Sequence, residues 1–213
     1  MNHWIDTLLI LVLLINIYVL GTSRLFAFVK AVALQSVILA VLPLLSQQYD
    51  AVHSWILFGL VLAIKGVLIP AFIVQTIKKI KIKREIEPFI SFSSSLFMGM
   101  LIVIVAFWLG DRIKLPLQLA SFLVLPVSLA TILIGLLILI TRKKAVTQVV
   151  GYLLLENGIY ILRLTLLGKI PLLIEVGILL DVFVAVFIMG IVLYHIDREF
   201  DHINIDELAR LKG

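Results

Sequence analysis

Cysteine is absent from this 213-residue chain, and charged residues make up only 15% of it. The lack of cysteine excludes disulfides, thiolate zinc sites, cysteine-ligated iron–sulfur clusters and thiol nucleophiles. A typical soluble domain has about 25% charged residues. The sequence also lacks a glycine-rich phosphate loop, a zinc motif and a recognisable Ser–His–Asp arrangement. We therefore expect no catalytic site, metal or cofactor in this chain.

Hydrophobic residues are abundant instead: they make up 62% of the chain, and the mean hydropathy is +1.20. Within a lipid bilayer every backbone N–H and C=O must bond inside the protein, which leaves helices or a closed barrel. Barrel strands are about 10 residues long and alternate in polarity. The apolar runs here are longer and apolar on all sides. The sequence therefore predicts an all-α integral membrane protein.

Seven stretches are long enough to cross a bilayer, which takes about 20 apolar residues. Short connections between them leave no room for a soluble domain, so we expect a bundle over 1–196 and a short tail over 197–213. The first residues, Met1–Asp6, lack the basic region of a signal peptide, so we expect the first span to be retained. The predicted spans are 4–22, 25–45, 51–77, 88–109, 115–140, 145–168 and 170–196.

Basic residues predict the orientation, because loops on the cytoplasmic side are enriched in Lys and Arg. Twelve Lys and Arg residues follow the first, third, fifth and seventh spans, and three lie in the alternate connections. This asymmetry places the N-terminus outside and the C-terminus in the cytoplasm of a cell-membrane protein. It also accounts for the net charge of +5 without a nucleic-acid partner.

Ionisable residues inside predicted spans are the candidate functional residues. A charged side chain at the bilayer centre costs at least about 2.5 kcal/mol, so such residues usually face the bundle interior. At about 1.5 Å per residue, Lys65, Glu156 and Asp181 all lie near the middle of the membrane. They could form a proton or ion path. The alternative is that they form static pairs that fix the helix packing.

The sixth span adds supporting polar residues. Glu156, Tyr160 and Arg163 are spaced i, i+4 and i+7 and share one helix face, with Asn157 beside Glu156. Arg163 and Glu175 lie toward the outer surface and could form a second pair. Near Lys65, Pro70 removes a helical hydrogen bond and could bend the third span, exposing carbonyl groups.

Several segments resemble one family of membrane proteins, the E component of hydrogenase 4 (HyfE), over the whole chain and most clearly from about residue 145 onward. These segments are Gly151–Tyr160 (GYLLLENGIY), Pro171–Asp181 (PLLIEVGILLD), Val182–Leu193 (VFVAVFIMGIVL), Ile203–Gly213 (INIDELARLKG) and Ala63–Pro70.

The last three predicted spans (115–140, 145–168 and 170–196), with 145–196 as their core, also resemble the three-helix NuoK subunit of respiratory complex I and the C subunit of Mrp antiporters. Gly151 and Asn157 match the ends of the NuoK pattern G-x-E-x-x-x-N, but Leu153 occupies the Glu position and the carboxylate comes at Glu156. Asp181 matches the acidic residue of the last NuoK helix.

The resemblance implies a non-catalytic membrane-arm subunit of a group 4 nickel–iron hydrogenase complex of the formate hydrogenlyase type. The implied partners are antiporter-like and NuoH-like membrane subunits and soluble hydrogenase subunits, which would carry the nickel–iron site and iron–sulfur clusters. Such an arm is thought to move protons or sodium ions. Two alternatives remain: a purely structural scaffold subunit and a small free-standing ion transporter.

Overall fold

The computed structural model describes residues 3–45, 50–80, 89–113, 121–166 and 177–190, except 181, 184 and 188. All regular secondary structure in these residues is helical. The elements are α1 (His3–Gly21), α2 (Leu25–Leu45), α3 (Ala51–Val61), a π-helix η1 (Leu62–Leu68), α4 (Ile69–Ile80), α5 (Phe92–Arg112), α6 (Val124–Thr141) and α7 (Ala145–Leu166).

Six helices in the described residues are long and apolar enough to cross a membrane: α1, α2, α5, α6, α7 and the continuous helix Ala51–Lys78 formed by α3, η1 and α4. A shorter apolar helix covers Gly177–Phe187. These helices confirm the predicted all-α membrane fold. Most of the seventh predicted span, 170–196, lies outside the described residues.

Two helices start later than the sequence predicted. The span predicted at 115–140 begins at Val124, because Ser121–Leu123 form a turn in which the Leu123 amide donates to Ser121 Oγ over 3.0 Å. Pro126 then falls in the first helical turn, where a missing N–H is tolerated. The span predicted at 88–109 begins at Phe92, after Ser91 caps the helix through the Ser94 amide.

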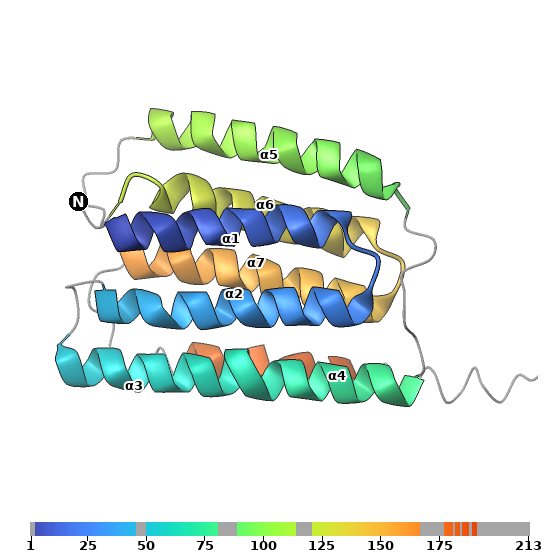
Figure 1. Cartoon of the computed structure of the whole chain (residues 1–213), viewed down its shortest axis with the longest axis horizontal. Helices are drawn as coiled ribbons and strands as arrows, with labels where there is room; N and C mark the ends of the chain where they lie inside the picture. The colour runs from blue at the N-terminus through green and yellow to red at the C-terminus, as the bar shows by residue number, and fades with distance from the viewer. Residues whose placement is uncertain are drawn as a thin grey trace, which may run out of the picture.

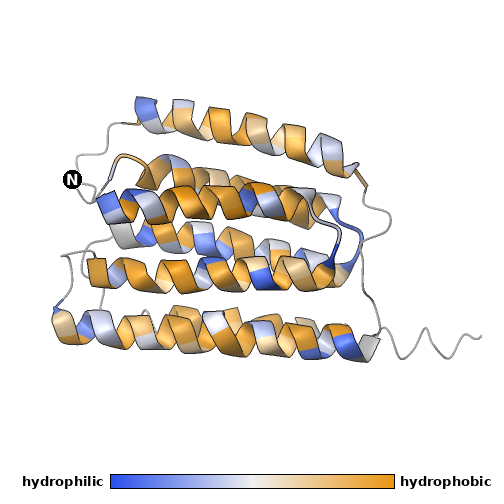
Figure 2. Cartoon of the chain, in the orientation of Figure 1, coloured by the Kyte–Doolittle hydropathy of each residue, from blue (hydrophilic) through white to orange (hydrophobic). Residues whose placement is uncertain are grey.

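The helices run alternately up and down the bundle (Figure 1). In that view α5 forms one edge and the α3–η1–α4 helix the opposite edge, with α1, α2, α6 and α7 between them. Among the described elements, α6 and α7 have the most extensive contact, and α2 contacts α1, α3, η1, α4 and α7. Hydrophobic residues cover the helices along most of their length (Figure 2), as expected for a surface that faces lipid.

Glycines allow α6 and α7 to approach closely. A Cβ atom on Gly135 would lie 2.7 Å from Leu155 Cα, and one on Gly158 would lie 2.7 Å from the backbone nitrogen of Ile132. Both distances are too short for any side chain. Small residues at a helix interface let two backbones pack tightly in a membrane, where dispersion contacts drive helix association.

The long helix Ala51–Lys78 accommodates Pro70 through the wider turns of η1. The amide of Ile69 donates to the carbonyl of Ile64, five residues earlier. Proline has no N–H and its ring crowds the preceding turn of an ordinary α-helix. A π-helical segment inside an α-helix is uncommon and is frequent at functional sites. Here it contains Lys65.

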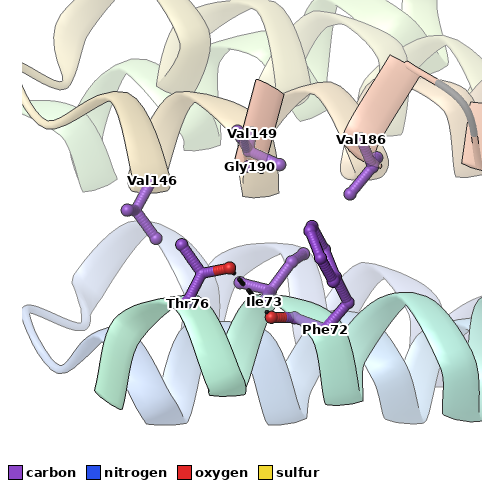
Figure 3. A pocket seen from close by; sticks show the side chains of 7 residues that line it. All are labelled: Phe72, Ile73, Thr76, Val146, Val149, Val186 and Gly190. Carbon is purple, nitrogen blue, oxygen red and sulfur yellow. Dashed lines mark hydrogen bonds between the residues drawn. The ribbon is translucent and has the colours of Figure 1, made fainter. Parts of the chain in front are cut away.

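The last described segment packs against α4 and α7. A small pocket there is lined by residues of all three elements (Figure 3). Phe72 contacts this segment closely, because a Cβ atom on Gly190 would lie 2.7 Å from its Cζ atom. The Thr76 hydroxyl donates to the Phe72 carbonyl over 3.0 Å, so it is satisfied within its own helix.

The described basic residues near the ends of α1, α4 and α6 lie at one end of the bundle; they are Arg24, Lys78, Arg142, Lys143 and Lys144. At that end Arg142 donates to the Leu20 carbonyl over 3.0 Å, and the Phe89 amide donates to the Thr141 carbonyl over 2.9 Å. Arg112 lies at the opposite end. The grouping of charges fits the predicted topology, while the side that faces the cytoplasm stays a prediction.

Candidate functional site

A layer of polar side chains crosses the middle of the bundle and separates two hydrophobic clusters. One cluster occupies the basic end and includes Val19, Phe28 and Ile138. The other occupies the opposite end and includes Leu9 and Leu39. Along each contributing helix, the change from one cluster to the other occurs at a buried polar residue. These residues are Asn16 of α1, Gln35 and Ser36 of α2, Lys65 of η1, Thr131 of α6, and Glu156 and Asn157 of α7.

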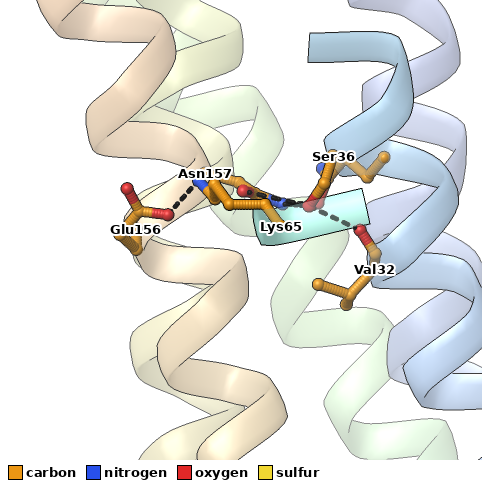
Figure 4. A network of polar contacts seen from close by, with 6 residues as sticks. Val32, Ser36, Lys65, Glu156 and Asn157 are labelled. Carbon is orange, nitrogen blue, oxygen red and sulfur yellow. Dashed lines mark hydrogen bonds and ion pairs between the residues drawn. The ribbon is translucent and has the colours of Figure 1, made fainter. Parts of the chain in front are cut away.

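Lys65 and Glu156 form an ion pair in this layer (Figure 4). The two side chains point toward each other from η1 and α7, and their residues are only 3% and 7% exposed. Removing two charges from water is expensive, and the penalty is offset only when the partners are close. The pair therefore joins the π-helical segment to α7 at mid-height.

Neutral side chains continue the layer as a chain of hydrogen bonds. Asn157 Nδ2 donates to Gln35 Oε1 over 3.1 Å, and Gln35 Nε2 donates to Asn16 Oδ1 over 2.9 Å. Asn16 Nδ2 donates to Thr131 Oγ1 over 2.8 Å, and that hydroxyl donates to a carbonyl of its own helix. Asn157 also bonds Ser36, whose hydroxyl donates to the Val32 carbonyl over 3.0 Å. This series of hydrogen bonds connects α7, α2, α1 and α6.

Tyr160 lies between two cations, one turn of α7 beyond Glu156. Lys65 Nζ is 5.1 Å from the centre of its ring, and Arg163 Cζ is 5.0 Å away. Contacts at this distance are attractive cation–π interactions, and they gain strength when desolvated. Arg163 is only 8% exposed, and its Nε and Nη1 have no hydrogen-bond partner among the described residues.

The structure thus gathers five of the seven residues proposed from the sequence. Lys65, Glu156, Asn157, Tyr160 and Arg163 form one buried cluster on η1 and α7. The other two, Asp181 and Glu175, lie outside the described residues, so their expected pairing with this cluster stays a prediction.

Sequence reasoning missed the neutral half of the layer, namely Asn16, Gln35, Ser36 and Thr131. Each is a polar residue near the middle of a predicted span, and all are at most 3% exposed. That position was a usable signal, because a buried polar group in a membrane must find a hydrogen-bond partner.

The sequence placed Arg142 in a connection between two spans but gave no sign that its side chain would be buried. Its side chain is fully buried at the basic end of the bundle. Besides bonding the Leu20 carbonyl, the guanidinium lies 4.5 Å from the centre of the Phe92 ring. Arg142 therefore ties the α6–α7 connection to α1 and α5, which is a structural role.

The chemistry available to the layer is proton exchange and ion coordination. A lysine and a carboxylate in contact can each hold or release a proton, and amide and hydroxyl oxygens can orient these groups by hydrogen bonds or coordinate a cation. No group of three or more His, Cys, Asp or Glu residues that could hold a metal occurs in the described part of the chain.

These features define a multi-pass, all-α membrane protein with a charged pair buried at mid-height. Among known proteins, hydrogenase-4 component E of Escherichia coli K12 is 31% identical over 116 residues, which are 54% of this chain and 54% of that protein. The component E of Shigella flexneri matches to the same extent. This chain therefore spans about half the length of the component E proteins it matches.

A longer match covers nearly the whole chain. The uncharacterized protein Rv0085 of Mycobacterium tuberculosis is 29% identical over 201 residues, 93% of this chain and 91% of that protein. No family model matches the chain, and no solved structure matches it significantly. The comparisons support the similarity to component E that the sequence segments indicated. The similarity to NuoK and to the Mrp subunit stays a prediction.

Proposed function

We propose that this chain is a membrane-arm subunit of an energy-converting nickel–iron hydrogenase complex and that its buried charges take part in proton or sodium movement. The assignment to a hydrogenase complex is supported by the similarity to hydrogenase-4 component E. The role in ion movement is supported by one observation above all, the Lys65–Glu156 pair in the middle of a membrane bundle.

In this proposal Glu156 and Asp181 carry protons or coordinate the ion, and Lys65 is their partner. Asn157, Tyr160, Arg163 and Glu175 orient or brace these groups. The antiporter-like, NuoH-like and soluble subunits of the complex would be the partners, and redox cofactors would reside in the soluble ones. The π-helical setting of Lys65 supports this role, because short π-helical segments inside α-helices are frequent at functional sites.

Membership of the complex is tested by purification in mild detergent through a tag on the C-terminus, followed by mass spectrometry. We expect antiporter-like and hydrogenase-like subunits in fixed ratio. A chain that purifies alone, folded and monodisperse would overturn the assignment and favour a free-standing transporter.

The ion path is tested by measuring ion movement per hydrogen turned over in membranes that carry variants. We expect Glu156→Gln and Asp181→Asn to lower ion movement while the complex stays assembled. Asp111→Asn is a matched control, because Asp111 is an exposed acid at the end of α5. Loss of assembly together with all activity, with no separate coupling defect, would identify the charges as a scaffold.

A further inference from the structure

An open groove runs along the outer face of α1 and α2, away from the polar layer. Its volume is about 700 Å³, and it is lined mainly by aliphatic side chains. Leu14 and Leu34 are more than half exposed there, at 57% and 55%. Two polar side chains, Tyr18 and Lys30, also line it.

The polar residues lie at one end of the groove because α1 and α2 are antiparallel neighbours. Tyr18 comes three residues before α1 ends, and Lys30 comes five residues after α2 begins. Leu11 and Ile38 line the groove toward its other end. At about 1.5 Å per residue, Lys30 and Ile38 are about 12 Å apart along α2. The groove is therefore polar at the end that lies near the basic end of the bundle, and apolar at the end lined by Leu11 and Ile38.

Lys30 is an exposed cation on the lipid-facing side of the protein. It forms no ion pair with an acid in the described part of the chain. A lysine in this position extends its head group toward the membrane surface. Arg24, also exposed, precedes it by six residues and lies about 9 Å nearer the helix start. Two positive charges thus follow one another from the groove to the end of the bundle.

We propose that this groove binds one anionic phospholipid, with an acyl chain along the aliphatic wall and the phosphate beside Lys30. Tyrosine is favoured at the level of lipid head groups, and Tyr18 lies only about 4.5 Å before the end of α1. Basic residues near a membrane surface attract anionic lipids. A helix of a partner subunit fits less well, because it would contact this face along most of the roughly 30 Å hydrocarbon core. The inference does not depend on the proposed function.

The test uses the full-length chain with whatever subunits remain bound to it, and native mass spectrometry after addition of phosphatidylglycerol or phosphatidylcholine. We expect preferential retention of phosphatidylglycerol. Lys30→Gln should weaken that retention about fivefold, since one lysine near a membrane surface contributes about this factor. Lys78→Gln is the matched control, an exposed lysine at the same end of the bundle but outside the groove.

A second variant fills the groove without touching the charge. Ala27→Trp should reduce retention of both lipids, because Ala27 lines the groove. Equal retention of the two lipids by the unaltered protein would overturn the proposal, as would equal losses for Lys30→Gln and Lys78→Gln. A photo-crosslinking residue at Leu34 gives an independent measurement in native membranes. Attachment to lipid supports the proposal, and attachment to a polypeptide overturns it in favour of a partner helix.

Discussion

Removing one member of the Lys65–Glu156 pair should destabilise the bundle much more than removing both. Lys65→Met leaves the Glu156 carboxylate, only 7% exposed, without its cation. Breaking a buried pair in this way costs about 3–5 kcal/mol, whereas replacing both members with apolar residues is often neutral. We therefore expect Lys65→Met and Glu156→Leu each to lower stability by roughly that amount, and the double variant to recover most of it.

The measurement is a double-mutant cycle on the purified chain, with unfolding followed as a function of SDS concentration or temperature. Such a cycle isolates the pairwise interaction when the two sites are in contact. Asp111→Asn again serves as the control for loss of an exposed charge. If the losses of the two single variants simply add in the double variant, the pair does not join η1 to α7, and the reasoning is refuted.

The same double variant separates the two roles discussed for the pair. The double variant removes both charges, so neither is left buried without a partner, and most of the stability lost in the single variants should return. A proton or ion path predicts an assembled complex that no longer moves ions. A scaffold predicts an assembled complex with normal ion movement. Single variants cannot make this distinction as cleanly, because each leaves a buried charge without its partner.

Three further predictions concern packing, hydrogen bonding and topology. Gly158→Leu should lower stability by about 1–3 kcal/mol or more, because the added side chain would overpack against α6. Gly59→Ala should be tolerated, because nothing lies within 4 Å of its Cβ position. Thermal unfolding of both variants measures the two changes in stability. Gln35→Leu should cost about 1–3 kcal/mol, because it leaves an Asn16 oxygen without its donor and removes one of the two acceptors of the Asn157 amide group. An unchanged melting temperature would contradict the hydrogen-bond chain. Since the chain has no cysteine, single Lys143→Cys and Arg112→Cys variants should react with impermeant thiol reagents from the cytoplasm and from outside, respectively; the reverse pattern would invert the predicted orientation.

Most of the fold could be predicted from the sequence, because long apolar runs leave helices as the main solution in a bilayer. Charged residues inside those runs were equally informative. Lys65 and Glu156 were predicted at the same depth from residue counting alone, but depth leaves the direction around the helix undetermined. Their contact depends on how η1 and α7 face each other, which packing decides.

Other features depended on local chemistry that a hydropathy pattern does not record. The start of α6 at Val124 follows from the turn at Ser121, where hydroxyl contacts compete with helical hydrogen bonds. The π-helical turns around Pro70 depend on how a long helix absorbs a missing amide. Asn16 and Gln35 were overlooked because neutral amides carry no charge, although burial makes their hydrogen bonds as necessary as ion pairs.

The hydrophobic cluster at the basic end has a consequence for electrical insulation. In the described part of the chain, the cluster at the basic end separates the charged layer from that membrane surface, whereas Tyr160 and Arg163 continue the layer toward the opposite surface. Within the described residues, charge in the layer can reach the basic end only by passing sideways, in the plane of the membrane, toward a neighbour. We therefore expect the isolated chain to be a poor conductor that holds a membrane potential without leak. Any current through Lys65 and Glu156 would then need a second subunit to provide an opening to water at the basic end.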